Sequence, residues 1–213
     1  MYIPPHFKED RIDVLHGLIQ QHSLAALVTL GPNGLIANHL PLIVDPEPAP
    51  FGTLRGHFSK ANSQWKESLP NVSALAIFQG PTAYITPSWY PSKAETGSVV
   101  PTYNYMVVHA YGPLTTFDDP DVLERHLRRL TAAHEAAFAD QWSLDDAPAA
   151  YIRGQMKGIV GIEIPIARLE GKCKLSQNRP AADQAGVVEG LSDSDNSSHR
   201  AMAQVISLRN PSK

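Results

Sequence analysis

The chain has 213 residues, of which 43% are hydrophobic, so it can bury a substantial core in one large domain or two small ones. Lys and Arg total 18 against 21 Asp and Glu, and the formal charge of −3 gives no attraction toward a polyanion. The single cysteine, Cys173, excludes an intramolecular disulfide and a multi-thiolate zinc site, and it predicts a packing role in a reducing compartment. The sequence lacks a signal-peptide pattern and a run of ~20 apolar residues, so we expect a cytoplasmic protein without a membrane span.

The first part of the chain predicts a helix followed by a hairpin. Apolar residues recur at three- and four-residue spacing over residues 10–22, which indicates an amphipathic helix. Residues 23–30 are rich in Leu, Val and Ala and stop at the turn sequence Gly31-Pro32-Asn33-Gly34. We therefore expect residues 35–44 to be the second strand of a hairpin. Residues 53–58 resume a strand pattern after a proline-rich stretch.

The middle of the chain predicts strands separated by one long loop. Residues 59–66 contain Ser and Asn, which are good N-cap residues, so a short helix is expected to begin there. Residues 73–78, 83–85 and 107–114 have the β-branched and aromatic content of strands. The loop over residues 87–102 is long and carries aromatic side chains, and such a loop is more often functional than idle.

The last part of the chain predicts helices and one strand. Residues 119–142 form the longest helical pattern, and residues 149–156 form a shorter one. Alternation over residues 158–164 indicates a strand. Many short strands with helices near the ends favour a mainly β, antiparallel fold with flanking helices (α+β) over alternating βαβ units. We expect one domain over residues 1–191 and a helical or partly disordered tail over residues 192–213.

The chain lacks the sequence signatures of several enzyme classes. It contains no G-x-G-x-x-G after a strand, no P-loop, no H-E-x-x-H, no C-x-x-C and no G-x-S-x-G. The pairs His126/His134 and His16/His22 are not at i, i+4 spacing, so no metal site is predicted. The basic run Arg125-His126-Leu127-Arg128-Arg129 is expected to form the solvated face of the long helix.

Three segments carry side chains that suit a phosphorylated, planar ligand. The first is a strand-to-helix junction whose free N–H groups attract an anion, although ordinary N-capping also explains it. The second combines flat rings with hydroxyl and amide groups, although core packing also explains such rings. The third is dense in donors, and it is either an anion or flavin contact or an exposed loop. The candidate residues are His57, Ser59, Lys60, Asn62 and Gln64 in the first segment, Tyr84, Ser88, Trp89, Thr102 and Asn104 in the second, and Lys174, Ser176, Gln177 and Arg179 in the third.

Several motifs in a fixed order make the chain resemble the PaiB family, and together they cover nearly its whole length. No single one of them is specific, but their combination is. The motifs are Met1-Tyr2-Ile3-Pro4, Gly56-His57, Lys60-Ala61-Asn62, Phe78-Gln79-Gly80-Pro81, Tyr84-Ile85, Pro87-Ser88-Trp89-Tyr90, Val100-Pro101-Thr102, Asn104-Tyr105, Lys157-Gly158-Ile159-Val160-Gly161 and Lys174-Leu175-Ser176-Gln177-Asn178-Arg179.

Members of the PaiB family are described as FMN-binding transcriptional regulators, and they share a split β-barrel with pyridoxamine-phosphate-oxidase-like flavoproteins. The resemblance implies a homodimer that holds FMN at its interface, with the phosphate near residues 57–64 and the ring near Tyr84, Trp89 and Asn104. Residues 176–179 resemble the C-terminal element that closes over the site. Lys60 stands where the family commonly has Arg, and Tyr103 where it commonly has Trp, which predicts weaker FMN binding.

The resemblance favours a negative transcriptional regulator that acts through FMN binding or sensing. The alternative is an FMN-dependent oxidoreductase acting on a small-molecule substrate or NAD(P)H, because one fold hosts both kinds of protein and the cofactor carries the redox chemistry. His57 or His109 is a candidate acid or base in such an enzyme, but no catalytic residue is assigned. A third alternative is a structural or haem-binding relative without flavin. Direct DNA binding is left open.

Overall fold

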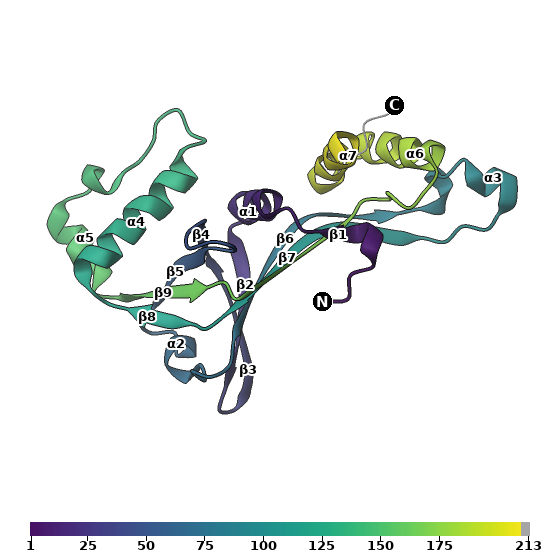
Figure 1. The fold of residues 1–213 in the computed structure, drawn as a ribbon. Coiled ribbons are helices and arrows are strands. Elements are labelled where there is room, and N and C mark those ends of the chain that lie inside the picture. The colour runs from purple at the N-terminus through teal and green to yellow at the C-terminus, as the bar shows by residue number, and fades with distance from the viewer. Residues whose placement is uncertain (210–213) are drawn as a thin grey trace. The chain divides into compact units, whose positions relative to one another are not determined.

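The computed structural model describes residues 1–209, and Figure 1 shows how its elements follow one another. The chain divides into two compact units. Unit 1 comprises Met1–Leu18, Gln79–Val108 and the chain from Glu170 onward, and unit 2 comprises Ile19–Phe78 and His109–Leu169. Four elements give residues to both units: α1 (Ile12–Gln21), β6 (Ala74–Ile85), β7 (Thr102–Gly112) and β10 (Arg168–Lys174).

Unit 2 contains the predicted hairpin and a separate four-stranded sheet. β2 (Leu24–Gly31) pairs antiparallel with β3 (Gly34–Pro41), and Gly34 has a φ of 114°, a backbone conformation that favours glycine. β2 also pairs with β6 over residues 75–77. The separate sheet has the order β4-β5-β9-β8, with strands β4 (Ile43–Asp45), β5 (Thr53–Ser59), β9 (Ile159–Pro165) and β8 (Thr115–Phe117).

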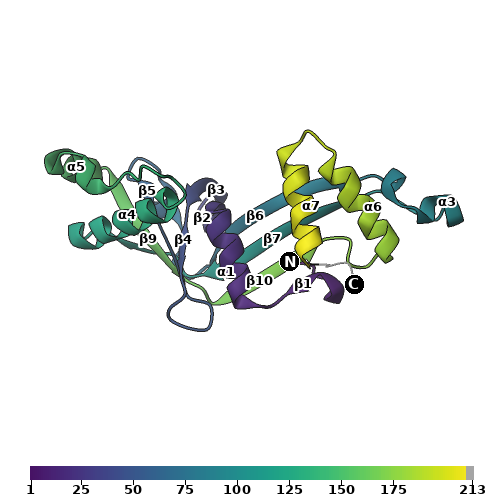
Figure 2. The same cartoon turned by 90° about the horizontal axis from the view of Figure 1, so that it is seen from above.

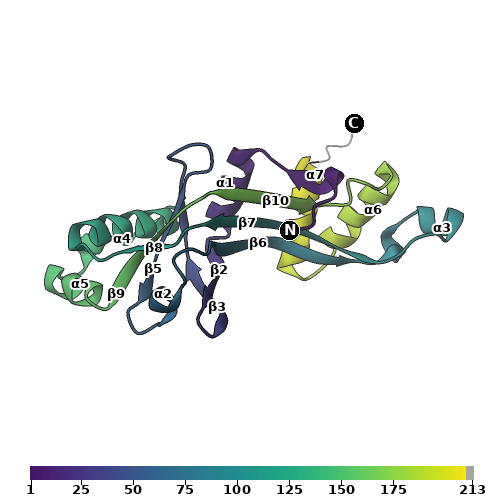
Figure 3. The same ribbon diagram turned by 60° about the horizontal axis from the view of Figure 1, so that its bottom comes forward.

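Helix α4 (Pro120–Glu135) lies along this separate sheet of unit 2, as Figures 1 and 3 show. It begins where the Asp119 carboxylate accepts hydrogen bonds from the N–H groups of Asp121 and Val122, which is the usual role of an N-cap residue. Its buried face turns Leu123, His126 and Leu130 inward. The other helices of unit 2 are α2 (Gln64–Glu67), η3 (Leu144–Asp146) and α5 (Ala149–Met156).

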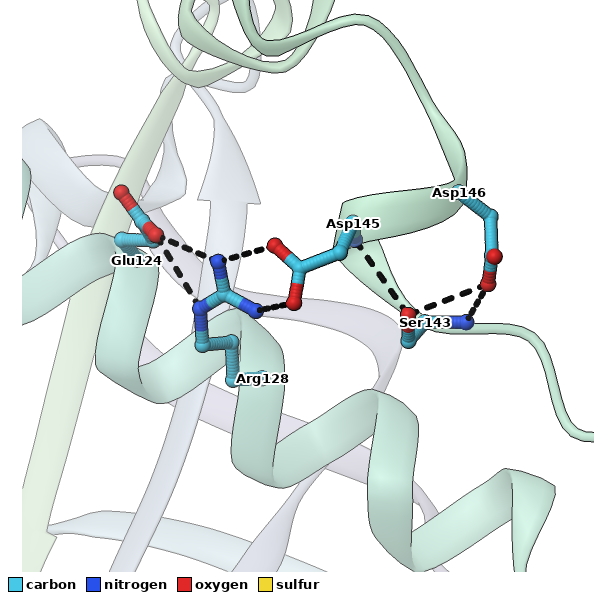
Figure 4. Close-up of polar contacts among 5 residues, drawn as sticks. All are labelled: Glu124, Arg128, Ser143, Asp145 and Asp146. Carbon is cyan, nitrogen blue, oxygen red and sulfur yellow. Dashed lines mark hydrogen bonds and ion pairs between the residues drawn. The ribbon is translucent and has the colours of Figure 1, made fainter.

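Arg128 on α4 fixes the segment that follows this helix. Its guanidinium donates to Glu124 Oε1 at 2.9 and 3.0 Å and to Asp145 at 2.8 and 2.9 Å, as Figure 4 shows. Ser143 and Asp146 form a capping box at η3. The Arg128 hydrogen bonds hold the pKa of Asp145 below its usual value. Because these groups are exposed, the network orders the segment more than it stabilises the fold.

Unit 1 is a sheet covered by two helices. Its strands have the order β1-β10-β7-β6, with β1 at Lys8–Glu9. Helices α6 (Ala181–Ser192) and α7 (Ser197–Arg209) lie over these strands in Figure 2, and they bury Val187, Leu191, Met202 and Ile206. The short helices of unit 1 are η1 (Pro5–Phe7), η2 (Pro87–Trp89) and α3 (Ser92–Thr96).

Glu9 ties β1 to α7 within unit 1. Its side chain is only 6% exposed, and it accepts hydrogen bonds from Arg11 at 2.8 and 2.9 Å and from Arg209 at 2.7 Å. The side-chain hydrogen bonds from Arg11 lower the pKa of Glu9 to about 2, even though burial opposes this shift, and the charge of Arg209 adds to it. Glu9 is therefore ionised in the folded protein down to strongly acidic pH.

Glu9 makes stability depend on pH in a defined window. A carboxyl group with a lowered folded pKa stabilises the fold above its unfolded pKa of 4.5, and this contribution is lost as pH falls toward about 2. The shift corresponds to roughly 3 kcal/mol at neutral pH. We expect Glu9→Gln to lower the free energy of unfolding in urea at pH 7, and the deficit to shrink by about half at pH 3. An equal loss of unfolding free energy at both pH values would contradict this expectation. The control is Asp10→Asn, which removes an exposed ion pair with Lys8.

The predicted class, mainly antiparallel β with flanking helices, is confirmed. One strand differs from the prediction, because the two strands predicted at residues 73–78 and 83–85 are parts of a single continuous β6 (Ala74–Ile85) that includes Pro81. β2 pairs with β6 only at residues 75–77, so the missing N–H of Pro81 interrupts no bond to β2. β7 begins at Thr102, earlier than the predicted residue 107.

The long helix was predicted to reach Trp142, and this is wrong. α4 ends at Glu135, and the Glu135 side chain accepts a hydrogen bond from the N–H of Trp142 at 3.0 Å. Phe138, which lies inside the predicted range, is 61% exposed. Apolar residues continue past the end of the helix, so their spacing does not mark where α4 stops.

The predicted boundary after residue 191 stays a prediction. Residues 197–209 form α7, and Met202, Ala203 and Ile206 are buried there. Residues 210–213 of the predicted tail lie outside the described residues. Over residues 1–209, none of the helices combines the length and apolar character needed to cross a membrane.

Candidate functional site

The predicted site residues form two clusters, one in each unit. In unit 1, two polar pairs join β7 to the end of β10 and the residues that follow it. Lys174 Nζ donates to Thr102 Oγ1, and Asn104 Nδ2 donates to Ser176 Oγ at 2.9 Å. Asn104 and Ser176 are buried, at 0% and 3% exposed. The structure therefore brings the second and third predicted segments together.

The Asn104–Ser176 pair has two unusual features. Asn104 Oδ1 is buried and has no hydrogen-bond partner among residues 1–209. Ser176 has a φ of 60°, which is uncommon outside glycine and costs backbone energy. An unpartnered buried acceptor beside a strained residue is typical of functional sites more than of packing alone.

Positive charge gathers beside these pairs. Lys172, Lys174 and Arg179 form no ion pair with a carboxylate among the described residues. Burial, and then the charges of Lys172 and Arg179, lower the pKa of Lys174. The Lys172 ammonium instead donates to the carbonyl of Tyr2 at 3.1 Å, and the Arg179 guanidinium lies 4.7 Å from the centre of the Tyr90 ring. Cations without counter-ions around a partly buried lysine are suited to an anionic ligand.

Aromatic side chains of unit 1 occupy two settings. The rings of Tyr84 on β6 and Tyr103 on β7 meet edge to face at 5.5 Å, and they are 46% and 56% exposed. Trp89 instead lies against α6, where Gly186 and Gly190 leave room for it. A Cβ at Gly186 would come within 2.0 Å of the Trp89 carbonyl oxygen, and one at Gly190 within 2.3 Å of the indole ring. The helix therefore fixes the position of Trp89.

The segment between Trp89 and β7 is anchored to the same helix. Asp183 on α6 is 1% exposed, and its carboxylate accepts hydrogen bonds from the Ser92 N–H at 3.1 Å and the Ser92 hydroxyl at 2.7 Å. Ser88 is exposed, and its hydroxyl accepts a hydrogen bond from Lys93 at 3.4 Å. The long loop predicted to be functional is thus held in place by a buried carboxylate.

Two other residues of the third segment have structural roles. The Gln177 side chain accepts from the Leu175 N–H and donates to the Cys173 carbonyl, so it closes the turn after β10. Cys173 is 2% exposed, and burial raises the pKa of its thiol, which fits a packing residue and not a nucleophile.

The cluster in unit 2 lies between β5 and α2. The N–H groups of Lys60, Asn62 and Gln64 donate to the Gly158 carbonyl, the Ser59 carbonyl and the Asn62 side chain respectively, and the Ala61 N–H donates to Ser59 Oγ. Few backbone N–H groups of this segment are therefore free to bind an anion. Helix α2 has only one turn, so it adds little to such a site. The exposed ammonium of Lys60 forms no ion pair with a described carboxylate and is the group there that suits a phosphate.

Gln64 lies behind this surface. It is 0% exposed, and its Nε2 donates to the carbonyls of Leu27 and Ile36 and to the Thr29 hydroxyl at 3.0 to 3.2 Å. Its Oε1 accepts from Asn38 Nδ2 at 2.8 Å. The side chain that the sequence offered as a cofactor contact is thus occupied in joining α2 to the β2–β3 hairpin.

His57 contacts a residue that the sequence did not connect with it. Its Nδ1 lies 3.2 Å from His126 Nε2 on α4. Burial lowers the pKa of both rings, and the nearby His57, Arg55 and Arg129 help to lower that of His126 to about 4. Both imidazoles are therefore neutral at pH 7. Sequence spacing gave no signal for this pair, since 69 residues separate its members.

A flavin phosphate and ring fit the donor set of unit 1. Lys174, Arg179 and Thr102 provide cations and a hydroxyl, Asn104 provides an unpartnered polar atom, and Tyr84 provides an exposed ring. Among residues 1–209 no three metal-ligating side chains gather.

The chain matches known proteins over most of its length. A family model described as "Putative FMN-binding domain" matches residues 1–168. The "Protease synthase and sporulation protein PAI 2" of Bacillus subtilis (strain 168) is 32% identical over 206 residues, which are 97% of this chain and 96% of that protein.

Solved structures show the fold. The flavocytochrome Anf3 of Azotobacter vinelandii has a TM-score of 0.57 at 11% identity, covering 81% of this chain and 72% of that chain. A putative 5-nitroimidazole antibiotic resistance protein of Bacteroides thetaiotaomicron has a TM-score of 0.56 at 12% identity, covering 77% and 84%. The predicted split-barrel class is thereby confirmed. The family match confirms the predicted cofactor, FMN, and the relative from Bacillus subtilis confirms the predicted resemblance to PaiB. The chain belongs to the family described as "Putative FMN-binding domain".

Proposed function

We propose that this protein binds FMN through the polar and cationic side chains of unit 1, and that it acts as a regulator by binding or sensing the flavin. We propose separately that the Lys60 ammonium contacts a flavin phosphate. The observation that carries the proposal is the set of uncompensated cations around the buried Asn104–Ser176 pair. Bound FMN supplies redox chemistry. The residues of this chain orient the cofactor, with Lys174 and Arg179 matching negative charge and Trp89 held by α6.

The basic run on α4 supports an indirect regulatory mechanism over direct DNA reading. Arg128 pairs with Glu124 and Asp145, and Arg129 pairs with Asp45 at 3.0 Å. His126 is buried, which corrects the expectation that the whole run is solvated. Only Arg125 in this run is left without an ion pair to a described carboxylate. Each phosphate contact of a DNA-binding protein requires its own Lys or Arg side chain. One uncompensated cation is therefore a weak basis for DNA binding.

Titration of the purified protein with FMN, followed by flavin fluorescence, tests cofactor binding. Lys60→Glu is expected to weaken the affinity about tenfold, because it replaces attraction to the phosphate by repulsion. Lys66→Glu makes the same charge change on α2, where Lys66 lies over the Trp65 ring at 4.9 Å, and it is expected to leave the affinity nearly unchanged. Equal losses in both variants would remove Lys60 from the site, and no quenching at high micromolar FMN would refute cofactor binding.

The oxidoreductase alternative has a separate test. Anaerobic mixing of the FMN complex with NADH or NADPH bleaches the flavin in a reductase, whereas in a sensor the flavin stays oxidised. His109 lies 3.3 Å from the Tyr111 hydroxyl, and His57 is engaged by His126. Because both rings already have partners, neither histidine is favoured as the proton donor of an oxidoreductase. We therefore prefer the sensing role over the oxidoreductase role.

We also propose that the protein is a homodimer that shares its flavin sites. The exposed rings of Tyr84 and Tyr103 support this, because large apolar side chains at a sheet surface often mark an interface. Sedimentation equilibrium with and without FMN measures the assembly, and a monomer under both conditions would refute it.

A further inference from the structure

Unit 2 contains a cavity that the flavin proposal does not use. It has a volume of about 300 Å³ and lies between α4 and the strands β4, β5, β8 and β9. This volume is at the lower end of the range for small-molecule sites. Its walls are formed by Ile43, Asp45, Arg55, Phe117, Val122, Arg125, His126, Arg129 and Glu163.

The charged residues of the cavity do not balance. Arg55 donates to Glu163 at 2.7 Å and also pairs with Asp45, and Arg129 donates to the same Asp45 oxygen at 3.0 Å. The two carboxylates are thus shared between Arg55 and Arg129. The guanidinium of Arg125 has no carboxylate partner among residues 1–209, and the cavity carries one positive charge more than it has negative charges.

A second polar group in the cavity wall lacks a partner. His126 is 3% exposed, and its Nδ1 is buried without a hydrogen bond among the described residues. Its Nε2 is already engaged by His57 at 3.2 Å. In the tautomer in which His57 donates to His126, the Nδ1 of His126 carries a hydrogen that has no acceptor. The ring of His126 also lines the cavity, so an anion bound there would lie beside this ring.

The remaining walls are apolar. The ring of Phe117 meets the His126 ring edge to face at 6.3 Å, and Ile43 and Val122 complete this side. Gly161 makes the place for Phe117, because a Cβ there would come within 2.2 Å of the ring. A few polar groups set among apolar walls are typical of sites for small organic molecules.

We propose that this cavity binds a small organic carboxylate with an apolar body, whose anionic end pairs with Arg125 beside the His126 ring. The planar guanidinium of Arg125 offers two parallel donors that match the two oxygens of a carboxylate. The single excess charge suits a monoanion better than a dianion such as a phosphate monoester. The apolar body packs against Phe117, Val122 and Ile43.

Calorimetric titration with benzoate tests the proposal, with benzamide as an uncharged molecule of the same shape and inorganic phosphate as an anion without an apolar body. Benzoate is expected to bind with a dissociation constant of roughly 1 mM or tighter. Arg125→Ala is expected to weaken it by about tenfold or more, through loss of a charge-assisted bidentate contact. Arg128→Ala removes the same charge from the same helix outside the cavity, and it is expected to change the affinity less than twofold.

The ring resonances of His126 provide a second readout that a general charge effect does not move. Benzoate is expected to shift them, and benzamide and phosphate are not. The proposal is overturned if benzoate does not bind at about 20 mM, a concentration far above the expected constant. It is equally overturned if benzamide or phosphate binds as well as benzoate, if Arg125→Ala leaves the affinity unchanged, or if Arg128→Ala weakens it as much.

Discussion

Alanine at Gly186 or Gly190 is expected to destabilise the protein by about 2–3 kcal/mol and to weaken FMN binding. Glycine to alanine inside a helix ordinarily stabilises by about 1 kcal/mol, so the expected sign is reversed. The reason is Trp89, whose carbonyl oxygen would be 2.0 Å from a Cβ at Gly186 and whose ring would be 2.3 Å from one at Gly190. The backbone contact at Gly186 has no flexible end that could move aside. The helix or the Trp89 segment must therefore shift.

Urea unfolding of both variants measures the loss of stability, tryptophan fluorescence reports the altered setting of Trp89, and FMN titration reports the site. Gly17→Ala is the matched control, because Gly17 also lies inside a helix, α1, and a Cβ there meets no atom within 4 Å. It is expected to stabilise by up to ~1 kcal/mol. Stabilisation by alanine at Gly186 or Gly190 would show that α6 does not hold Trp89.

Gln64→Leu is expected to lower the free energy of unfolding by about 3–4 kcal/mol, near the upper end for a single substitution. The leucine removes three donated hydrogen bonds and one accepted bond from a side chain that is 0% exposed. The Leu27 carbonyl, whose hydrogen bond to Gln64 is buried, would lose its donor. Lys60→Glu, by contrast, is expected to leave stability nearly unchanged, which separates the scaffold from the cofactor contact.

Gln64→Glu keeps the shape of the side chain and isolates the hydrogen bonds. The carboxylate would face carbonyl oxygens without a counter-ion, so its pKa in the folded state would rise. A raised folded pKa gives stability at low pH that is lost as pH rises, and the variant is therefore expected to be less stable at pH 8 than at pH 5. Gln21→Leu, at an exposed position in α1, is the control for adding an apolar side chain. Similar stability of Gln64→Glu at both pH values would contradict the buried network.

Local patterns predicted the elements that local physics determines. The Asn33-Gly34 turn fixed the β2–β3 hairpin, because Gly34 adopts a positive φ that few residues tolerate. The helices at residues 12–21 and 149–156 followed from the spacing of apolar residues along the chain. β8 and β10 were missed. β8 has only three residues, and β10 contains Arg, Glu and Lys, which give little strand signal when pairing with neighbours supplies the stability.

The candidate site was predicted in part. Ordered motifs named residues that the fold brings together in unit 1, namely Thr102 with Lys174 and Asn104 with Ser176. The candidate segments also named Gln64 and Gln177, whose side chains bond to the protein itself. A residue type indicates which bonds a side chain can make, but the partner is decided by the fold.

The sequence by itself determined the mainly β class, the family and the flavin, because hydrophobic period, turn residues and motif order are all properties of neighbouring residues along the chain. Only the tertiary structure decided three contacts: His57 meets His126, two glycines of α6 make room for Trp89, and Arg125 is the one arginine of its basic run without a carboxylate partner within residues 1–209. These contacts join positions many residues apart. Their geometry depends on how sheets and helices pack, and no local pattern encodes it.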